Sequence, residues 1–278
     1  MNAPQLLTPV EIITDYAEIG AKKAASPTGK LFLLGILAGF LIGMGAAVTN
    51  TAAHAIVNVS VARVISGLLF PFGLGVVMLI GAELFTGNCM IPISLLEGRS
   101  TIKGMLRNWV IVYLGNFVGA VLLAASCAYS GQMNYSDGGL SVYTIKVAAA
   151  KCAVGFIPAM LLGVLCNVLV CLGVLCSLSA RDSAGRVLGA YIPVVFFVIC
   201  GFEHSVANMY YIPAGLFAMD VPVYAAKVSG AGVDVAALTW GKFFMSNLLP
   251  VTVGNVLGGV GLGALLWKCY LAKAGTLT

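Results

Sequence analysis

Two short segments place ionisable and hydrogen-bonding side chains inside long apolar runs. The segment GAELFTGNCMIP covers residues 81–92, and GFEHSVANMYYIP covers residues 201–213. Glu83 is the only charged residue of its run, Glu203 is the only one of the other, and His204 follows directly. A carboxylate or an imidazole in such surroundings can stabilise or transfer a proton, or hydrogen-bond a small polar solute.

The two segments match each other at a constant offset of 120 residues. The matching residues are Gly81 with Gly201, Glu83 with Glu203, and Asn88 with Asn208. The segments GNFVG at 115–119 and GNVLG at 254–258 echo each other as well. Glycine permits unusual backbone angles, and the Glu and Asn side chains can hydrogen-bond loosened loops. We therefore expect the matched residues to hold two broken helices together.

His204 and Thr86 break this symmetry. Position 84 is Leu where position 204 is His, and position 206 is Val where position 86 is Thr. A lone buried histidine can be a packing residue whose hydrogen bonds are satisfied. The symmetric residues already account for holding the breaks, however, and an unmatched titratable group beside a broken helix favours a functional role. We interpret His204 as the residue that acts on the solute.

The elements that carry these residues must lie in a membrane. Of the 278 residues, 60% are hydrophobic and 9% are charged, whereas about 25% are charged in soluble domains. The net charge of +5 is spread without a basic cluster, so it indicates membrane topology and not nucleic-acid binding. The eight cysteines form no CxxC pair and lie mostly in apolar runs. They are interpreted as small buried hydrophobes, and no metal site or cofactor is expected.

Six apolar runs are long enough to cross the hydrocarbon core of a bilayer. They cover about 31–48, 64–96, 109–129, 152–179, 187–219 and 243–267. The second and fifth runs lie in stretches of 33 residues that would make straight helices of about 50 Å, too long for the core. We therefore predict an all-α integral membrane protein of six transmembrane helices in which spans 2 and 5 are broken.

The chain is predicted to be a single membrane domain, 1–278, built from two halves. An odd number of crossings separates each motif from its match, so the halves run in opposite directions and form inverted three-helix repeats. The first repeat covers 31–129 and the second 149–267. Residues 8–24 precede them as an amphipathic helix that begins at Thr8 with a capping box and lies at the membrane surface.

Basic residues indicate the orientation. Ten of the fifteen Lys and Arg lie in the N-terminal segment, the 97–107 and 180–186 loops, and the C-terminal tail with Lys268 and Lys273. The positive-inside rule therefore predicts a multi-pass protein of the cell's inner (plasma) membrane with both termini in the cytoplasm.

The motifs GAELFTGNCM, LCNVLVCLGV at 165–174, GFEHSVANMYYIP and the paired GN segments resemble the formate/nitrite transporter family. The resemblance covers about residues 10–270 in order and spacing. It implies a homopentamer in which each protomer has its own pore through an aquaporin-like six-helix bundle. The Asn-Pro-Ala motif of the aquaporins themselves does not occur in this sequence.

The resemblance also implies roles for single residues. His204 matches the family's central histidine, and Thr86 matches the threonine of its flexible loop. The cytoplasmic constriction would be formed by Leu74 and Leu84, with Asn167 and Val170 facing them. The outer constriction would be formed by Phe70 and Phe197. Lys151 matches a lysine that draws anions towards the pore, although a lysine there can equally be an interfacial anchor.

These residues suggest how an anion could pass. Rings of Leu and Phe exclude bare ions, because a charge in an apolar gap is costly. We hypothesise that Lys151 concentrates a small weak-acid anion, that His204 or its hydrogen-bond network supplies or stabilises a proton, and that the neutral acid crosses. Thr86 would hydrogen-bond the substrate. The predicted partners are thus the anion, a proton and the lipid bilayer.

Several alternatives stay open at this point. Formate is preferred because Phe70 and Phe197 match the aromatic pair of the formate channels, but nitrite and hydrosulfide channels share the ELFTG motif. An intramembrane enzyme using Glu203 and His204 is disfavoured, because neither an HExxH motif nor a GxSxG motif is present. A membrane sensor or structural protein without transport is the remaining class.

Overall fold

The computed structural model describes residues 6–272, and within this range the chain is helical with no strand. Lys273 of the basic C-terminal tail lies outside the described residues. In chain order the elements are α1 (Pro9–Ala25), α2 (Thr28–Ala53), α3 (Val59–Leu69), α4 (Phe72–Ile80), α5 (Phe85–Asn88), α6 (Pro92–Leu96), α7 (Ile102–Tyr129), η1 (Gln132–Asn134), α8 (Tyr135–Cys152), α9 (Phe156–Ser179), α10 (Ser183–Cys200), α11 (Ser205–Met219), α12 (Pro222–Gly230), α13 (Trp240–Lys242), the π-helix η2 (Phe243–Leu248) and α14 (Leu249–Tyr270).

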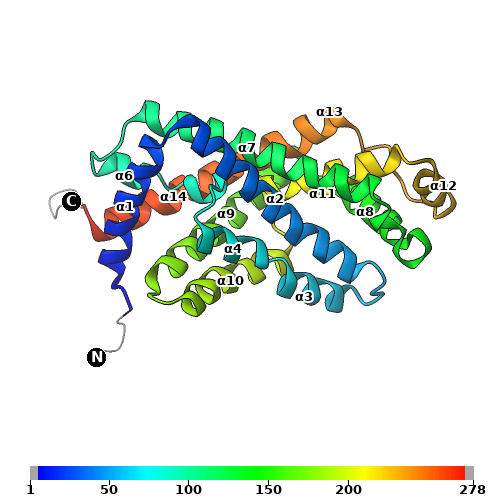
Figure 1. The fold of residues 1–278 in the computed structure, drawn as a ribbon, viewed down its shortest axis with the longest axis horizontal. Helices are drawn as coiled ribbons and strands as arrows, with labels where there is room; N and C mark the ends of the chain where they lie inside the picture. Colours follow the sequence, from blue (N-terminus) through cyan, green and yellow to red (C-terminus); the bar gives the residue numbers. More distant parts are fainter. Residues whose placement is uncertain (1–5, 273–278) are drawn as a thin grey trace.

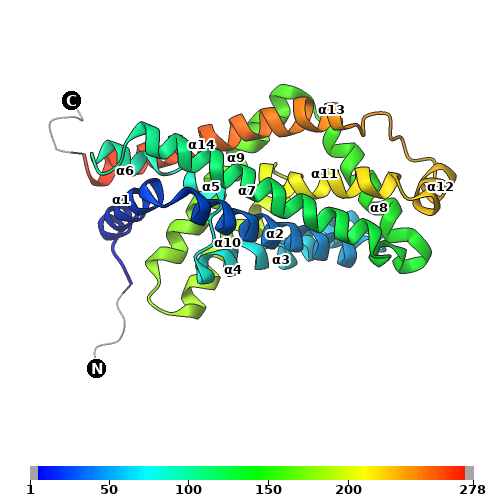
Figure 2. The ribbon, with the colours of Figure 1, turned by 45° about the horizontal axis from the view of Figure 1, so that its top comes forward.

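Six helical segments among the described residues are long and apolar enough to cross a membrane. They are Thr28–Ala53, Val59–Ile80, Ile102–Tyr129, Phe156–Ser179, Ser183–Cys200 and Trp240–Tyr270. The all-helical class and the number of six apolar helices are therefore as the sequence predicted. Helix α1, the start of α2 and the end of α14 lie at one end of the elongated molecule, while α12 and the loop before α3 lie at the other (Figure 1, Figure 2).

Both long apolar runs contain a non-helical stretch of four residues. Helix α4 ends before Gly81, which has φ 71° and ψ 31°, and α5 begins at Phe85. Helix α10 ends before Gly201, which has φ 72° and ψ 30°, and α11 begins at Ser205. These positive φ values are accessible to glycine at little cost. The two stretches, 81–84 and 201–204, lie where the matched motifs begin.

At several glycine residues, two helices pack so closely that their backbones are in contact. A Cβ atom on Gly39 of α2 would overlap the carbonyl of Asn116 on α7, and one on Gly119 would overlap the carbonyl of Ile36. Between α14 and α9, Gly254 lies in the same way against the carbonyl of Met160. Small residues allow this approach, which favours association where lipid removes the hydrophobic driving force. The frame around the two stretches is therefore tightly packed.

Helix α1 covers the end of the molecule at which α14 ends (Figure 2). Thr8 caps it, and both hydrogen bonds of the capping box to Glu11 are present. Its buried face includes Ile13 and Tyr16, and it contacts α6, α7, α9 and α14. The apolar side of α1 thus packs against the protein.

Candidate functional site

Two cavities approach the middle of the molecule from opposite ends. The narrow cavity has a volume of about 300 Å³, and its lining includes Lys23, Glu83 and Leu84. The wide cavity has a volume of about 700 Å³, and its lining includes Lys151, Glu203 and His204. Each cavity is lined by the first residues of one broken motif, and residues 84 and 204 are the matched positions at which the motifs differ.

Thr86 lies outside the lining of both cavities and contacts His204, which lines the wide cavity. Thr86 is fully buried. Its Oγ1 atom lies 2.9 Å from Nε2 of His204. Thr86 belongs to α5 and His204 caps α11, so this hydrogen bond joins the two motifs.

The contacts of His204 fix its tautomer. The backbone N–H of Ala207 donates to Nδ1 of His204 at 3.1 Å. A nitrogen that accepts carries no proton, so in the neutral ring Nε2 carries it and donates to Oγ1 of Thr86. The hydroxyl hydrogen of Thr86 then remains free to donate to another acceptor. The site thus holds a neutral imidazole and a hydroxyl whose hydrogen can turn towards a solute.

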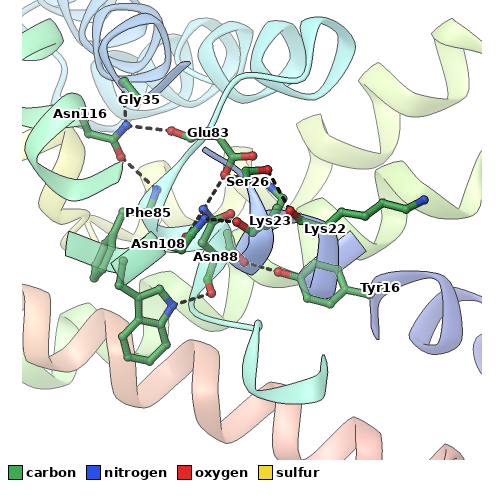
Figure 3. A network of polar contacts seen from close by, with 12 residues as sticks. Tyr16, Lys22, Lys23, Ser26, Gly35, Glu83, Phe85, Asn88, Asn108 and Asn116 are labelled. Carbon is green, nitrogen blue, oxygen red and sulfur yellow. Dashed lines mark hydrogen bonds and ion pairs between the residues drawn. The ribbon is translucent and has the colours of Figure 1, made fainter. Parts of the chain in front are cut away.

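Amide side chains secure the first non-helical stretch (Figure 3). Nδ2 of Asn88 donates to Oε2 of Glu83 at 2.7 Å and to Oδ1 of Asn108 at 2.8 Å. Nδ2 of Asn116 donates to the carbonyls of Gly35 and Glu83, and its Oδ1 accepts the N–H of Phe85. The backbone groups that the missing helical turn leaves free therefore find partners inside the protein.

The second stretch is secured by the same pattern. Nδ2 of Asn208 donates to Oε2 of Glu203 at 2.6 Å and to Oδ1 of Asn247 at 2.7 Å. Asn255 donates to the carbonyls of Gly163 and Glu203 and accepts the N–H of Ser205. The hydrogen bonds found at the first non-helical stretch therefore recur at the second.

Each glutamate also pairs with a lysine. Nζ of Lys151 lies 2.8 Å from Oε1 of Glu203, and Nζ of Lys23 lies 2.9 Å from Oε2 of Glu83. Figure 3 shows the pair of Lys23 and Glu83 beside the amide network. The ammonium group of Lys151 further lies 5.3 Å from the ring centre of Tyr211. A lysine at the end of each cavity therefore meets the carboxylate of the broken motif.

The Phe and Leu residues that the sequence predicts at the two constrictions line the two cavities. The rings of Phe70 and Phe197 meet edge to face at 5.7 Å, and Phe197 stacks on His204 at 5.9 Å. All three line the wide cavity. Leu74 and Leu84 line the narrow cavity.

Two further residues predicted from the fourth span lie on α9. Val170 is buried, with 2% of its surface exposed. Nδ2 of Asn167 donates to the carbonyls of Thr86 and Asn255, at 3.1 and 2.6 Å. Oδ1 of Asn167 is buried and has no hydrogen-bond partner within residues 6–272. An acceptor is thus left free beside Thr86.

Sequence reasoning missed three members of these networks: Lys23, Asn108 and Asn247. The asparagine of each GN segment, Asn116 or Asn255, enters the sequence prediction only through the echo between the two segments, whereas its hydrogen bonds to the non-helical stretch follow from the structure. A pattern for Asn108 and Asn247 exists, because each precedes the asparagine of its GN segment by eight residues.

In the part of the chain that the structure describes, no group of three His, Cys, Asp or Glu side chains could hold a metal.

Comparison with known proteins gives matches that cover nearly the whole chain, including both motifs. A model of the family described as formate/nitrite transporter matches residues 10–268. The chain is 36% identical to a probable formate transporter of Methanothermobacter thermautotrophicus, which covers 96% of this chain and 98% of the relative. It is 34% identical to formate channel FocA of Escherichia coli strain K12, over 98% and 97%. A solved pentameric formate channel with formate bound has 35% identity and a TM-score of 0.77, covering 90% of this chain and 99% of the other.

Proposed function

The chain belongs to the formate/nitrite transporter family, and from this we propose that it conducts small monovalent weak-acid anions across the membrane, with formate as its substrate. It is a multi-pass membrane protein of a family of channels and transporters, not of enzymes. The preference for formate is supported by relatives named formate channels at 34 to 36% identity and by the paired rings of Phe70 and Phe197.

The hydrogen bond between Thr86 and His204 carries this proposal. It adjoins the wide cavity, and both cavities are lined by positively charged residues and by apolar side chains. An ion cannot cross an apolar gap cheaply, but a neutral acid can. The free hydroxyl hydrogen of Thr86 would donate to a carboxylate oxygen, and Oδ1 of Asn167 would accept the O–H of the acid. His204 acts as a neutral donor that orients Thr86.

Lys151 and Lys23 draw the anion to the two mouths. Each lysine side chain is partly exposed, with 18% of its surface accessible in Lys151 and 22% in Lys23, and each is paired with a glutamate. A positive group at the mouth raises the local concentration of an anion and also favours its charged form until it moves inward. The proton is then taken up from water in the cavity as the anion leaves the lysine and approaches Phe70 and Phe197 or Leu74 and Leu84.

The architecture that we propose is an inverted repeat with broken second and fifth spans. Matching hydrogen bonds at Glu83 and Glu203, and the nearly equal angles of Gly81 and Gly201, support it. The hydroxyl groups of Tyr113 and Thr252, which occupy matched positions before the GN segments, bond to each other at 2.7 Å. Such a contact is expected only near an axis that relates the halves. We take the six-helix bundle to be aquaporin-like, with domain and repeat limits as predicted from the sequence.

We further propose a homopentamer with one pore in each protomer, in the inner membrane, with both termini in the cytoplasm. The pentamer is supported by the solved relative described as pentameric. The orientation is supported by the excess of Lys and Arg at the end of the molecule where α1 begins and α14 ends (Figure 1). In this orientation the narrow cavity faces the cytoplasm.

A flux assay in proteoliposomes tests the function. Formate, nitrite and hydrosulfide are compared at several pH values, with empty liposomes and a Thr86→Val variant as controls. We expect formate flux above both controls, rising as the pH falls. Nitrite or hydrosulfide passing faster than formate would assign the substrate within the family differently. Absence of flux for all three anions would contradict transport and favour a sensor or structural protein.

A further inference from the structure

The wide cavity is much larger than a one-carbon anion requires. Its volume of about 700 Å³ falls within the range of sites for drug-sized ligands, about 300–1,000 Å³. Its polar wall includes Asn50, Arg63, Tyr143, Lys146, Lys151 and Tyr211. We call the wide cavity with this polar wall the wide vestibule. The narrow cavity has less than half the volume and no arginine in its lining. The wide vestibule therefore provides space and donor groups that the passage of formate leaves unused.

Two cations of the wide vestibule have no carboxylate partner. Lys151 is paired with Glu203, but neither Arg63 nor Lys146 forms an ion pair within residues 6–272. Glu203 is the only acidic residue in the cavity lining, and it is already engaged. Arg63 and Lys146 thus leave two uncompensated positive charges facing one water-accessible space.

The guanidinium group of Arg63 has a defined position. It lies over Gly201, so that a Cβ atom built on Gly201 would be 2.8 Å from Nη1 of Arg63. Burial raises the pKa of Tyr143, and the nearby charge of Arg63 opposes this rise. The guanidinium fork therefore lies at the start of the 201–204 stretch, in the lining of the same cavity as Tyr143. A planar guanidinium fork suits a carboxylate, which accepts two parallel N–H bonds from arginine.

We propose that the wide vestibule is a binding site for short-chain dicarboxylates, which occupy the mouth of the pore and block it. One carboxylate binds Arg63 and the other binds Lys146. A dicarboxylate would need to take up two protons before it could cross the ring of Phe70 and Phe197, so it binds without passing. The site would let an external dicarboxylate control the flux of a monocarboxylate.

Direct binding tests the site without relying on transport. Succinate and butyrate have four carbons each and differ by one carboxylate, so they are titrated calorimetrically into the full-length protein in detergent. We expect succinate to bind about tenfold more tightly than butyrate, and Arg63→Gln and Lys146→Gln each to weaken succinate binding about tenfold. Arg63→Lys keeps the charge but loses the fork, and should also weaken it. The control is Lys227→Gln, because Lys227 pairs with Asp137 outside the cavity lining.

Equal binding of succinate by the wild type and Arg63→Gln would overturn the proposal, and so would an equal loss in Lys227→Gln. In proteoliposomes, succinate should lower formate flux when added on the side of the wide vestibule, relative to butyrate at matched ionic strength. Binding of succinate without any reduction of formate flux would overturn the proposal that the bound dicarboxylate blocks the pore. If the protein carries no formate at all, the proposed function fails, while the calorimetric titration still decides whether the site exists.

Discussion

The Oγ1 atom of Thr86 and the Nε2 atom of His204, two residues that are 118 positions apart in the chain, lie 2.9 Å apart and join the two motifs. Nδ1 of His204 accepts the N–H of Ala207, so the shared proton belongs to Nε2. In this geometry the histidine is the donor and the threonine is the acceptor, so the hydroxyl hydrogen of Thr86 is free to donate to another group. Functional variants of the site should therefore separate the threonine hydroxyl from the imidazole.

Thr86→Val should reduce formate flux. Valine keeps the volume, but leaves the buried Nε2–H of His204 without an acceptor, at a cost of about 1–3 kcal/mol. If the full cost falls on the transport step, flux drops by about fivefold or more. Thr86→Ser keeps the hydroxyl and should retain most of the flux. Wild-type flux in the valine variant, measured in proteoliposomes, would show that the hydroxyl takes no part.

His204→Asn and His204→Ala should differ in stability but not in transport. Asparagine is a favoured N-cap and can still accept the N–H of Ala207, whereas alanine cannot, which costs about 1 kcal/mol. Thermal unfolding in detergent should place the alanine variant below the asparagine variant. Neither side chain replaces the donor to Thr86, so both should lose flux. A His204→Ala protein with wild-type formate flux and unchanged pH dependence would refute the role of the histidine.

Lys23→Gln and Lys151→Gln should destabilise the protein by similar amounts. Each leaves a buried glutamate without its cation, at a cost of about 2 kcal/mol or more. Adding Glu83→Gln to Lys23→Gln removes the unpaired charge and should recover part of the loss. Lys22→Gln is the control, because Lys22 is exposed and forms no ion pair within residues 6–272. Melting temperatures measure all four variants, and an unaffected Lys23→Gln protein would contradict the pairing.

Gly119→Ala should impair folding, whereas Gly29→Ala should not. A methyl group on Gly119 overlaps the carbonyl of Ile36, so α2 and α7 must separate, and overpacking of this kind costs about 1–3 kcal/mol. Gly29 has nothing within 4 Å of a built Cβ atom. The yield of folded protein from size-exclusion chromatography and its melting temperature give the comparison. Equal values for the two variants would mean that the helices do not pack as closely as described.

Acid should loosen the start of α1. Glu11 accepts the N–H and hydroxyl of Thr8, and these hydrogen bonds lower the pKa of its carboxyl group. A lowered folded pKa means that the stabilisation is present above the ordinary pKa and is lost as the pH falls through the folded value. Hydrogen exchange of the first turn, corrected for the intrinsic pH dependence, should therefore rise in this window. Glu11→Gln should remove the pH dependence, and its persistence would exclude the capping box as the cause.

Much of this architecture could be predicted from residue patterns. Composition and six apolar runs are enough for the helical membrane class, and the matched motifs locate the non-helical stretches at Gly81 and Gly201. Lys23 could have been found as well, because LLG at 33–35 and LLG at 161–163 give an offset of 128 that pairs Lys23 with Lys151. The sequence interpretation places residues 8–24 at the membrane surface, and a surface helix gives no reason to expect an ion pair between Lys23 and Glu83.

Other features depend on three-dimensional contacts that no local pattern contains. The tautomer of His204 follows from a backbone N–H whose position exists only once α11 has formed. The difference in volume between the cavities depends on how α3 and α8 surround one mouth while α1 covers the other. The free acceptor of Asn167 is likewise visible only when both partners of its amide are known.

The glycine contacts between α2 and α7 have a consequence for how fast this protein can change conformation. Backbones that touch, as at Gly39 and Gly119, leave no room for one helix to slide past the other, so a rocking motion of the halves would have to break many contacts at once. The freedom that remains lies in side chains such as Phe70 and Leu84. Both side chains are buried, so they rotate more slowly than exposed side chains, which take picoseconds to nanoseconds, but their rotation requires no domain motion of microseconds to milliseconds. A frame this stiff therefore favours rotation of single side chains over movement of whole helices as the source of any change along the proposed pore.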